Sequence, residues 1–222
     1  GAFRMKHNTK LKTAWILSVI LLYLVWSLTE LVITPAVGEA VMEPVKELGG
    51  KLLLWALPAW LLIRQFDEEV CVPTREAFRP QKRWWPWLCG GMAVMLVYQI
   101  VIKLRTGESI LEFSPDFGAY SVLSACCIGL GEELVFRGWL LGATVQPGKE
   151  WQAVAVNAVL FLCIHFPIWI RDGLFWPYIT SLAFLQIVLL SVVFALSYLH
   201  TRSVAVPAIL HAWWDMLCFL YG

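Results

Sequence analysis

The sequence predicts an all-α protein, a polytopic bundle of about seven transmembrane helices (six to eight) around a polar cavity inside the membrane. Hydrophobic residues make up 59% of the 222 residues and charged residues only 15%, whereas soluble proteins average about 45–50% and about 25%. Apolar runs of roughly 20 residues, the length that crosses a bilayer, recur along the chain. Ionisable side chains gather inside the later runs. This composition excludes a disordered chain and an ordinary soluble enzyme.

The apolar runs predict seven spans. The second is short and needs residues on its Lys51 side to cross a bilayer, and the sixth is long enough to tilt or to break near Pro177. The predicted spans are Ala14–Ile33, Leu52–Ile63, Trp84–Ile102, Tyr120–Leu141, Trp151–Ile170, Gly173–Leu199 and Ser203–Tyr221.

Charges in the connections predict the orientation, because Lys and Arg favour the cytoplasmic side. Basic residues dominate the N-terminal tail and the connection of residues 65–83, whereas Lys46 and Lys51 lie in a connection that also carries acidic residues. We therefore expect an integral protein of the plasma (inner) membrane with a cytoplasmic N-terminus. Glu30, near the outer end of the first span, is expected at the interface. The net charge of +1 implies no nucleic-acid partner, and the oligomeric state stays open.

Six ionisable side chains fall inside three of the last four predicted spans. Such a group costs several kcal/mol in the hydrocarbon core unless it is paired or faces a wet cavity, so its presence predicts a function. The six are Glu132, Glu133, Arg137, His165, His211 and Asp215.

Helical spacing assigns these groups to faces. Glu133 and Arg137 are four residues apart and can pair, and so can His211 and Asp215. Glu132 points about 100° away from Glu133. Arg137 can neutralise only one of the two carboxylates, so we expect the other to lie unpaired in a low-dielectric cavity, where it suits a general base.

Two interpretations of this set compete. A catalytic cavity would use a carboxylate and a histidine to activate water, with other groups stabilising the oxyanion. Structural ion pairs that fix helix register are the alternative. The spread of acids and histidines over three spans favours catalysis. We predict no cofactor: the chain lacks His-Glu-x-x-His and any spaced zinc site, although two Glu, two His and one Asp leave a metal-dependent membrane protease as an alternative.

Three short motifs carry a resemblance to a known family. The Gly-Glu-Glu-Leu-Val-Phe-Arg-Gly sequence of residues 131–138 resembles the Glu-Glu-x-x-x-Arg motif of the CAAX-protease and bacteriocin-processing family, which includes the Ras-converting-enzyme type of intramembrane glutamic protease. Residues 161–165 are similar to its Phe-x-x-x-His motif, and residues 211–215 to its His-x-x-x-Asn/Asp motif. The motifs occur in order, each on an apolar span, and the resemblance covers roughly residues 121–222.

The resemblance implies a conical cavity open to the cytosol and peptide hydrolysis without a covalent intermediate. It implies Glu132 as the base that activates water, His165 as a group that holds and polarises this water, His211 and Asp215 as the oxyanion side, and Glu133 and Arg137 as organisers of the site. The third motif often ends in Asn, whose amide donates a hydrogen bond. Asp215 donates only when protonated, so orienting His211 is an alternative role for it.

These observations predict three parts of the chain. Residues 1–13 form a cytoplasmic tail that begins with a four-residue cloning remnant, residues 14–119 form three membrane helices, and residues 120–222 form the catalytic core. The leading hypothesis is an intramembrane endopeptidase acting on a membrane-anchored peptide or protein: a prenylated C-terminus, a peptide precursor or a C-terminal sorting segment. A non-catalytic peptide-binding or bacteriocin-immunity protein and a small transporter are the alternatives.

Overall fold

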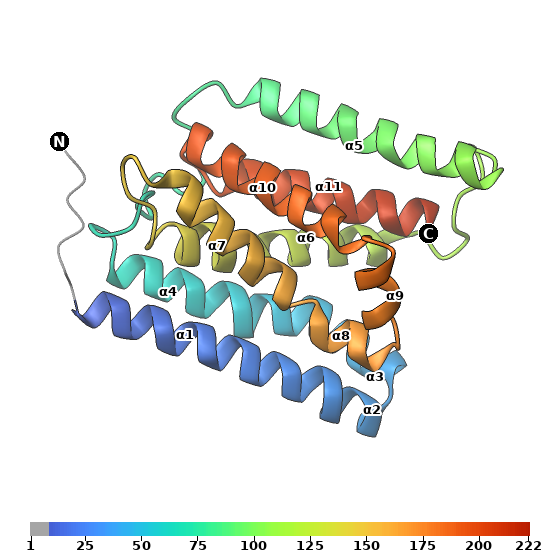
Figure 1. Cartoon of the computed structure of the whole chain (residues 1–222), viewed down its shortest axis with the longest axis horizontal. Coiled ribbons are helices and arrows are strands. Elements are labelled where there is room, and N and C mark those ends of the chain that lie inside the picture. The colour runs from blue at the N-terminus through green and yellow to red at the C-terminus, as the bar shows by residue number, and fades with distance from the viewer. Residues whose placement is uncertain (1–8) are drawn as a thin grey trace.

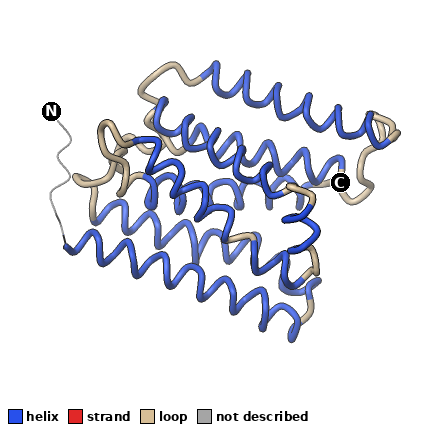
Figure 2. Tube along the Cα trace, in the orientation of Figure 1, coloured by secondary structure: helices blue, strands red, loops and turns tan. Residues whose placement is uncertain are grey.

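The computed structural model describes residues 9–222, and all regular structure in that range is helical (Figures 1 and 2). The first half contains α1 (Thr9–Leu28), the π-helical η1 (Thr29–Ile33), α2 (Thr34–Val37), α3 (Glu39–Pro44), the π-helical η2 (Val45–Ala56), α4 (Leu57–Gln65) and α5 (Trp85–Thr106). The second half contains α6 (Ala119–Glu133), the π-helical η3 (Leu134–Leu141), α7 (Glu150–Cys163), α8 (Phe166–Arg171), α9 (Phe175–Thr180), α10 (Phe184–Thr201) and α11 (Ala205–Tyr221).

The helices form the predicted polytopic bundle. Five segments are long and apolar enough to cross a membrane: Thr9–Val37, Trp85–Thr106, Ala119–Leu141, Glu150–Arg171 and Phe184–Thr201. The shorter apolar helix α11 and the continuous stretch of η2 and α4 run alongside them (Figure 1). These two passes and the five long segments correspond to the seven predicted spans. The protein is an integral membrane protein with an all-helical fold.

Three predicted spans have different limits in the structure. The second extends over residues 45–65, so that it includes Lys46 and Lys51, which the sequence had placed in a connection. The fifth is broken between α7 and α8, where Pro167 follows the break. The sixth breaks between α9 and α10, and Leu182 in that turn adopts a positive φ of 63°. A break near Pro177 was one of the two predicted alternatives.

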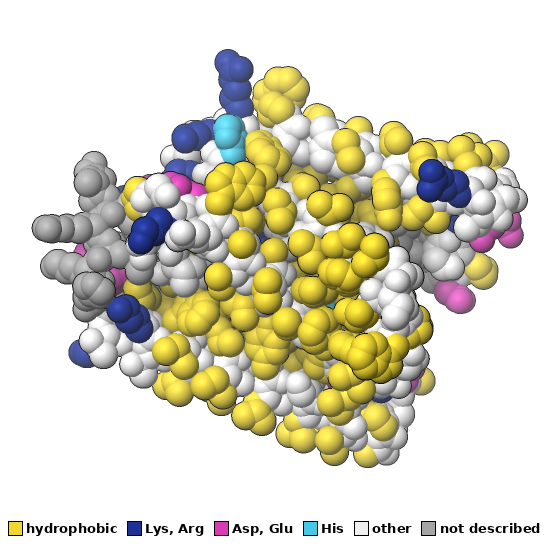
Figure 3. All heavy atoms as spheres, in the orientation of Figure 1, with side chains coloured by type: hydrophobic (Ala, Val, Ile, Leu, Met, Phe, Trp, Pro, Cys, Tyr) yellow, Lys and Arg dark blue, Asp and Glu magenta, His cyan; other side chains and the backbone are white. Residues whose placement is uncertain are grey.

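Apolar side chains are spread over much of the face of the bundle that Figure 3 shows, as lipid contact requires. Leu24 of α1 is 61% exposed and Val94 of α5 is 69% exposed. Such exposure would be costly in water but matches a hydrocarbon solvent. The outer helices therefore present their apolar faces to the bilayer rather than to a soluble partner.

The continuous helix formed by α6 and η3 lies at the centre of the bundle. All eight residues of η3 are buried. Two glycines let neighbouring helices approach its backbone: a Cβ on Gly129 would lie 2.7 Å from the Ala208 carbonyl oxygen of α11, and a Cβ on Gly131 would lie 2.7 Å from the Lys51 carbonyl oxygen of η2. Small residues at such contacts permit close packing of membrane helices. The α6, α11 and η2 segments are thereby held together around the predicted site residues.

Replacing Gly129 by alanine is expected to destabilise the bundle, because the added methyl meets the backbone of α11 and cannot be relieved by a rotamer change. Overpacking of this kind costs about 1–3 kcal/mol. Thermal unfolding in detergent should therefore show a lower midpoint for Gly129→Ala than for the wild type.

The matched control is Gly90→Ala in α5, where an added Cβ meets no atom within 4 Å. Both substitutions gain the same helix propensity, about 1 kcal/mol, so their difference isolates the contact with α11. Equal midpoints for the two variants would contradict the close approach of α6 and α11.

Candidate functional site

The structure brings five of the six predicted site residues into one buried cluster. Glu132 and Glu133 end α6, and Arg137 follows one turn later in η3. His211 and Asp215 lie on α11, which packs against α6. The π-helical turn of η3 begins directly after the two glutamates, and single π turns often mark functional sites.

The Glu133 carboxylate is the shared acceptor of the cluster. Its Oε1 atom accepts hydrogen bonds from Arg137 Nη1 at 2.8 Å and from His211 Nδ1 at 2.8 Å. Glu133 and Arg137 are completely buried, and His211 is 5% exposed. The predicted pairing of Glu133 with Arg137 is confirmed. Because Glu133 accepts from Nδ1, it fixes the ring of His211 and leaves Nε2 facing the rest of the cluster.

Arg137 connects this cluster to α10 and α7. Its Nη2 atom donates to the Ser191 carbonyl oxygen at 3.1 Å and to Ser191 Oγ at 2.8 Å. The guanidinium carbon lies 4.4 Å from the ring centre of Phe161 and 5.4 Å from that of Phe194. The Phe194 ring also stacks on His211, with 4.9 Å between the ring centres. The buried Arg137 guanidinium is therefore contacted by a carboxylate, a serine and two aromatic rings.

Two carboxylate oxygens face His211 Nε2. Glu132 Oε2 lies 3.8 Å away and Asp215 Oδ2 lies 3.7 Å away, both beyond direct hydrogen-bond distance. Among the described residues neither oxygen has a hydrogen-bond partner. The bond that orients His211 is made by Glu133, so Asp215 does not hold the ring through Nδ1. These three atoms form the polar centre of the site.

Lys51 is a member of the site that the sequence analysis missed. Its Nζ atom donates to Glu132 Oε1 at 2.7 Å, and the residue is 3% exposed. The same ammonium lies 3.6 Å from the ring centre of Trp55 and 4.4 Å from that of Trp26. The expectation of a glutamate without a counter-ion is therefore wrong, because η2 delivers a lysine from 81 residues earlier in the chain. The sequence did indicate that Lys51 belongs to a span, because the second apolar run was too short to cross a bilayer without the residues around Lys51.

A second buried ionic cluster lies next to the first. Glu30 in η1 is completely buried, not interfacial as predicted, and accepts from Lys46 Nζ at 2.8 Å and from Arg171. Arg171 also bonds Glu39 at 2.8 Å. The Trp26 ring is close to both clusters, with its centre 5.9 Å from Lys46 Nζ and 4.4 Å from Lys51 Nζ. Carboxylates, ammonium groups and aromatic faces thus compensate one another inside an apolar bundle.

His165 lies at the edge of the site. It occupies the break between α7 and α8, where its Nδ1 atom donates to the Phe161 carbonyl oxygen at 2.8 Å. The Phe161 ring centre is 5.1 Å from the His165 ring and 5.8 Å from the His211 ring. His165 is half-buried and interacts electrostatically with Glu132.

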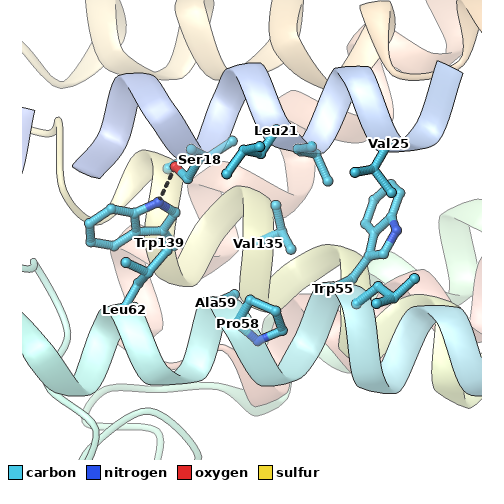
Figure 4. A pocket seen from close by; sticks show the side chains of 12 residues that line it. Ser18, Leu21, Val25, Trp55, Pro58, Ala59, Leu62, Val135 and Trp139 are labelled. Atoms are coloured by element: carbon cyan, nitrogen blue, oxygen red, sulfur yellow. Dashed lines mark hydrogen bonds between the residues drawn. The ribbon is translucent and has the colours of Figure 1, made fainter. Parts of the chain in front are cut away.

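An apolar groove of about 260 Å³ lies between α1, η2, α4 and η3 (Figure 4). Trp139 Nε1 donates to Ser18 Oγ at 2.8 Å on its wall. Trp55, which contacts the Lys51 ammonium, also lines the groove. A hydrocarbon chain in this groove would therefore be separated from the ion pair between Lys51 and Glu132 by the Trp55 side chain.

The metal alternative finds no ligand cluster in the described part of the chain. Among residues 9–222, no three His, Cys, Asp or Glu side chains are grouped closely enough to hold a metal ion. Glu132 and Glu133 each give one carboxylate oxygen to a cation, Lys51 and Arg137 respectively.

Comparison with known proteins identifies the same part of the chain. The sequence model of the family described as "Type II CAAX prenyl endopeptidase Rce1-like" matches residues 115–217. No curated protein and no solved structure gives a significant match. The matched residues contain all three motifs and the whole cluster around Glu133, which confirms the resemblance inferred from the motifs and supports a membrane endopeptidase. The motif-bearing part of this membrane protein, residues 115–217, is similar to the Rce1-like family.

Proposed function

We propose that the protein is a glutamic-type intramembrane endopeptidase that hydrolyses a peptide bond by direct attack of water. The observation that supports this most strongly is the buried Glu132 Oε2 atom, which has no hydrogen-bond partner among the described residues and lies 3.8 Å from His211 Nε2. A carboxylate beside an imidazole suits proton transfer to and from water.

The reaction proceeds in two proton transfers. Glu132 removes a proton from the water while the water oxygen forms a bond to the scissile carbonyl carbon. His165 polarises the same water. The carbonyl electrons move onto oxygen, and the resulting oxyanion lies on the side of His211 and Asp215. Collapse of this intermediate breaks the C–N bond, and Glu132 returns the proton to the leaving amine. Water alone adds across the peptide bond, and no acyl-enzyme forms.

Lys51 and Glu133 prepare these groups for reaction. The Lys51 ammonium favours the ionised form of Glu132, which a general base requires. Because Lys51 binds Oε1, it leaves Oε2 for the water. Glu133 and Arg137 hold His211 in position. Lys51 is thus a positioning residue for the base, as Glu133 is for the histidine.

The substrate we propose is anchored in the bilayer. A prenylated C-terminus, a peptide precursor or a C-terminal sorting segment would each present a hydrocarbon portion beside the scissile bond. The groove of Figure 4 supports such a substrate because Trp55 lines it and also contacts Lys51. We further propose the plasma (inner) membrane as the location, with the N-terminus in the cytoplasm, on the strength of the basic N-terminal tail.

Glu132→Gln tests the reaction. The substitution keeps the shape of the side chain but removes the base, so we expect peptide-bond cleavage to fall by at least about 10²-fold. Protein termini in membranes from cells expressing each form should show cleavage products that depend on Glu132. These termini would also identify the substrate and its scissile bond.

The control is Glu150→Gln at the exposed start of α7, which should leave the termini unchanged. Identical termini in wild-type and Glu132→Gln membranes, with both proteins expressed in the native host, would contradict proteolysis. Such a result would favour the peptide-binding alternative.

The ion pair between Lys51 and Glu132 can be measured by a double-mutant cycle. Lys51→Met leaves the Glu132 carboxylate buried without a cation, so we expect a loss of stability that Glu132→Gln in the same protein partly restores. Coupled neighbours show interaction energies of about 0.5–3 kcal/mol. Unfolding of the four proteins in detergent gives this energy, and additive effects would contradict a direct pair.

Chelation tests the metal alternative. If Glu132 activates water without a metal, activity in purified membranes should be unchanged after prolonged treatment with EDTA or 1,10-phenanthroline. Loss of cleavage that added Zn²⁺ restores would replace the glutamic mechanism by a metal-dependent one.

A further inference from the structure

A pocket of about 440 Å³ with an acidic lining lies beside the cluster around Glu133. Glu43 of α3, Glu47 of η2 and Asp116 in the connection before α6 contribute carboxylates to it, and Ser124 of α6 contributes a hydroxyl. No lysine or arginine is among its lining residues. We call this space the acidic pocket.

The acidic pocket continues the catalytic site along three helices. Glu47 precedes Lys51 by one turn of η2, and Cys218 and Phe219 follow Asp215 by one turn of α11. On α6, Ser124 and Glu132 are eight residues apart, which places them about 80° from each other around the helix. That separation corresponds to about 12 Å along the helix axis. The two sites therefore lie in line, close enough for one bound peptide to reach both.

The polar atoms of the pocket are poised to accept hydrogen bonds. Within residues 9–222, none of Glu43, Glu47 and Asp116 forms a salt bridge, unlike the acids of the two ionic clusters. Ser124 is 2% exposed and lines the pocket, and its hydroxyl oxygen has no hydrogen-bond partner in the same range. A buried hydroxyl without a partner is uncommon in proteins. Glu47 interacts electrostatically with Lys46 and Lys51, so the exposed carboxylates of Glu43 and Asp116 and the free hydroxyl oxygen are the groups that match a further cationic donor.

We propose that the acidic pocket binds a lysine or arginine side chain of the peptide substrate, about three to four residues from the scissile bond. This inference rests on the proposed endopeptidase function. The spacing follows from the distance of about 12 Å and a rise of about 3.3–3.6 Å per extended residue. A metal ion is a poorer occupant, because among the described residues no acids are grouped closely enough to ligate one, whereas a long organic cation can reach separated carboxylates.

Paired peptides test the pocket independently of cleavage. The probes are two fluorescent, lipid-anchored nonapeptides of Ala, Ser and Leu that differ at one position, arginine in one and glutamine in the other. The Glu132→Gln protein in nanodiscs should bind the arginine peptide about tenfold more tightly, and added salt should reduce the difference. Glu43→Gln with Asp116→Asn should remove the preference; both residues are exposed, so the fold is retained.

Glu112→Gln is the matched control, because Glu112 lies in the same connection as Asp116 but does not line the pocket. It should keep the preference for arginine. Equal binding of the two peptides, or no binding of either, would overturn the acidic pocket as a cation site.

The same peptides separate this inference from the proposed function. Cleavage by the wild type without any preference for arginine overturns the pocket and leaves the protease intact. Arginine-dependent binding without cleavage supports the acidic pocket and overturns the proposed protease function. In the comparison of membrane termini, support for the pocket would be a basic residue recurring three to four positions from the Glu132-dependent sites.

Discussion

The carboxylate of Glu133 is the group on which the rest of the site depends. One oxygen receives both the Arg137 guanidinium and the His211 imidazole, so a single buried charge joins η3 to α11. Arg137 then reaches Ser191 on α10. In lipid no water can compensate a side chain that loses its partner. The geometry of the reactive atoms is consequently tied to the packing of the bundle rather than to a flexible loop.

The two adjacent glutamates serve this arrangement in different ways. Glu133 lies wholly within the protein and uses one oxygen for two donors, whereas Glu132 gives one oxygen to Lys51 and keeps the other toward His211 Nε2. Neighbouring positions on a helix point in directions about 100° apart. One turn of α6 can thus supply both a structural anchor and a reactive group.

The length of the apolar runs was sufficient to predict the bundle and its passes. Helical spacing predicted the pairing of Glu133 with Arg137, because a helix places residues four apart on one face. Lys51 escaped prediction because its partner is 81 residues away and helix packing alone decides which helices meet. Glu30 escaped for the same reason, since it meets Arg171 only when α8 packs on η1. Whether the six motif residues carry out the reaction stays a prediction.

The glycine contacts of α6 have a mechanical consequence. Backbone touches backbone at Gly129 and Gly131, so α6 cannot slide against α11 or η2 without a collision. By contrast, the path from α7 to α10 is interrupted three times: at His165 before α8, at Gly173 before α9 and at Leu182 before α10. The α8 and α9 helices are therefore short segments between interruptions, whereas α6 continues into η3 without a break. His165 lies at the first of these interruptions, so a shift of α8 relative to α7 would also move its ring relative to the cluster around Glu133.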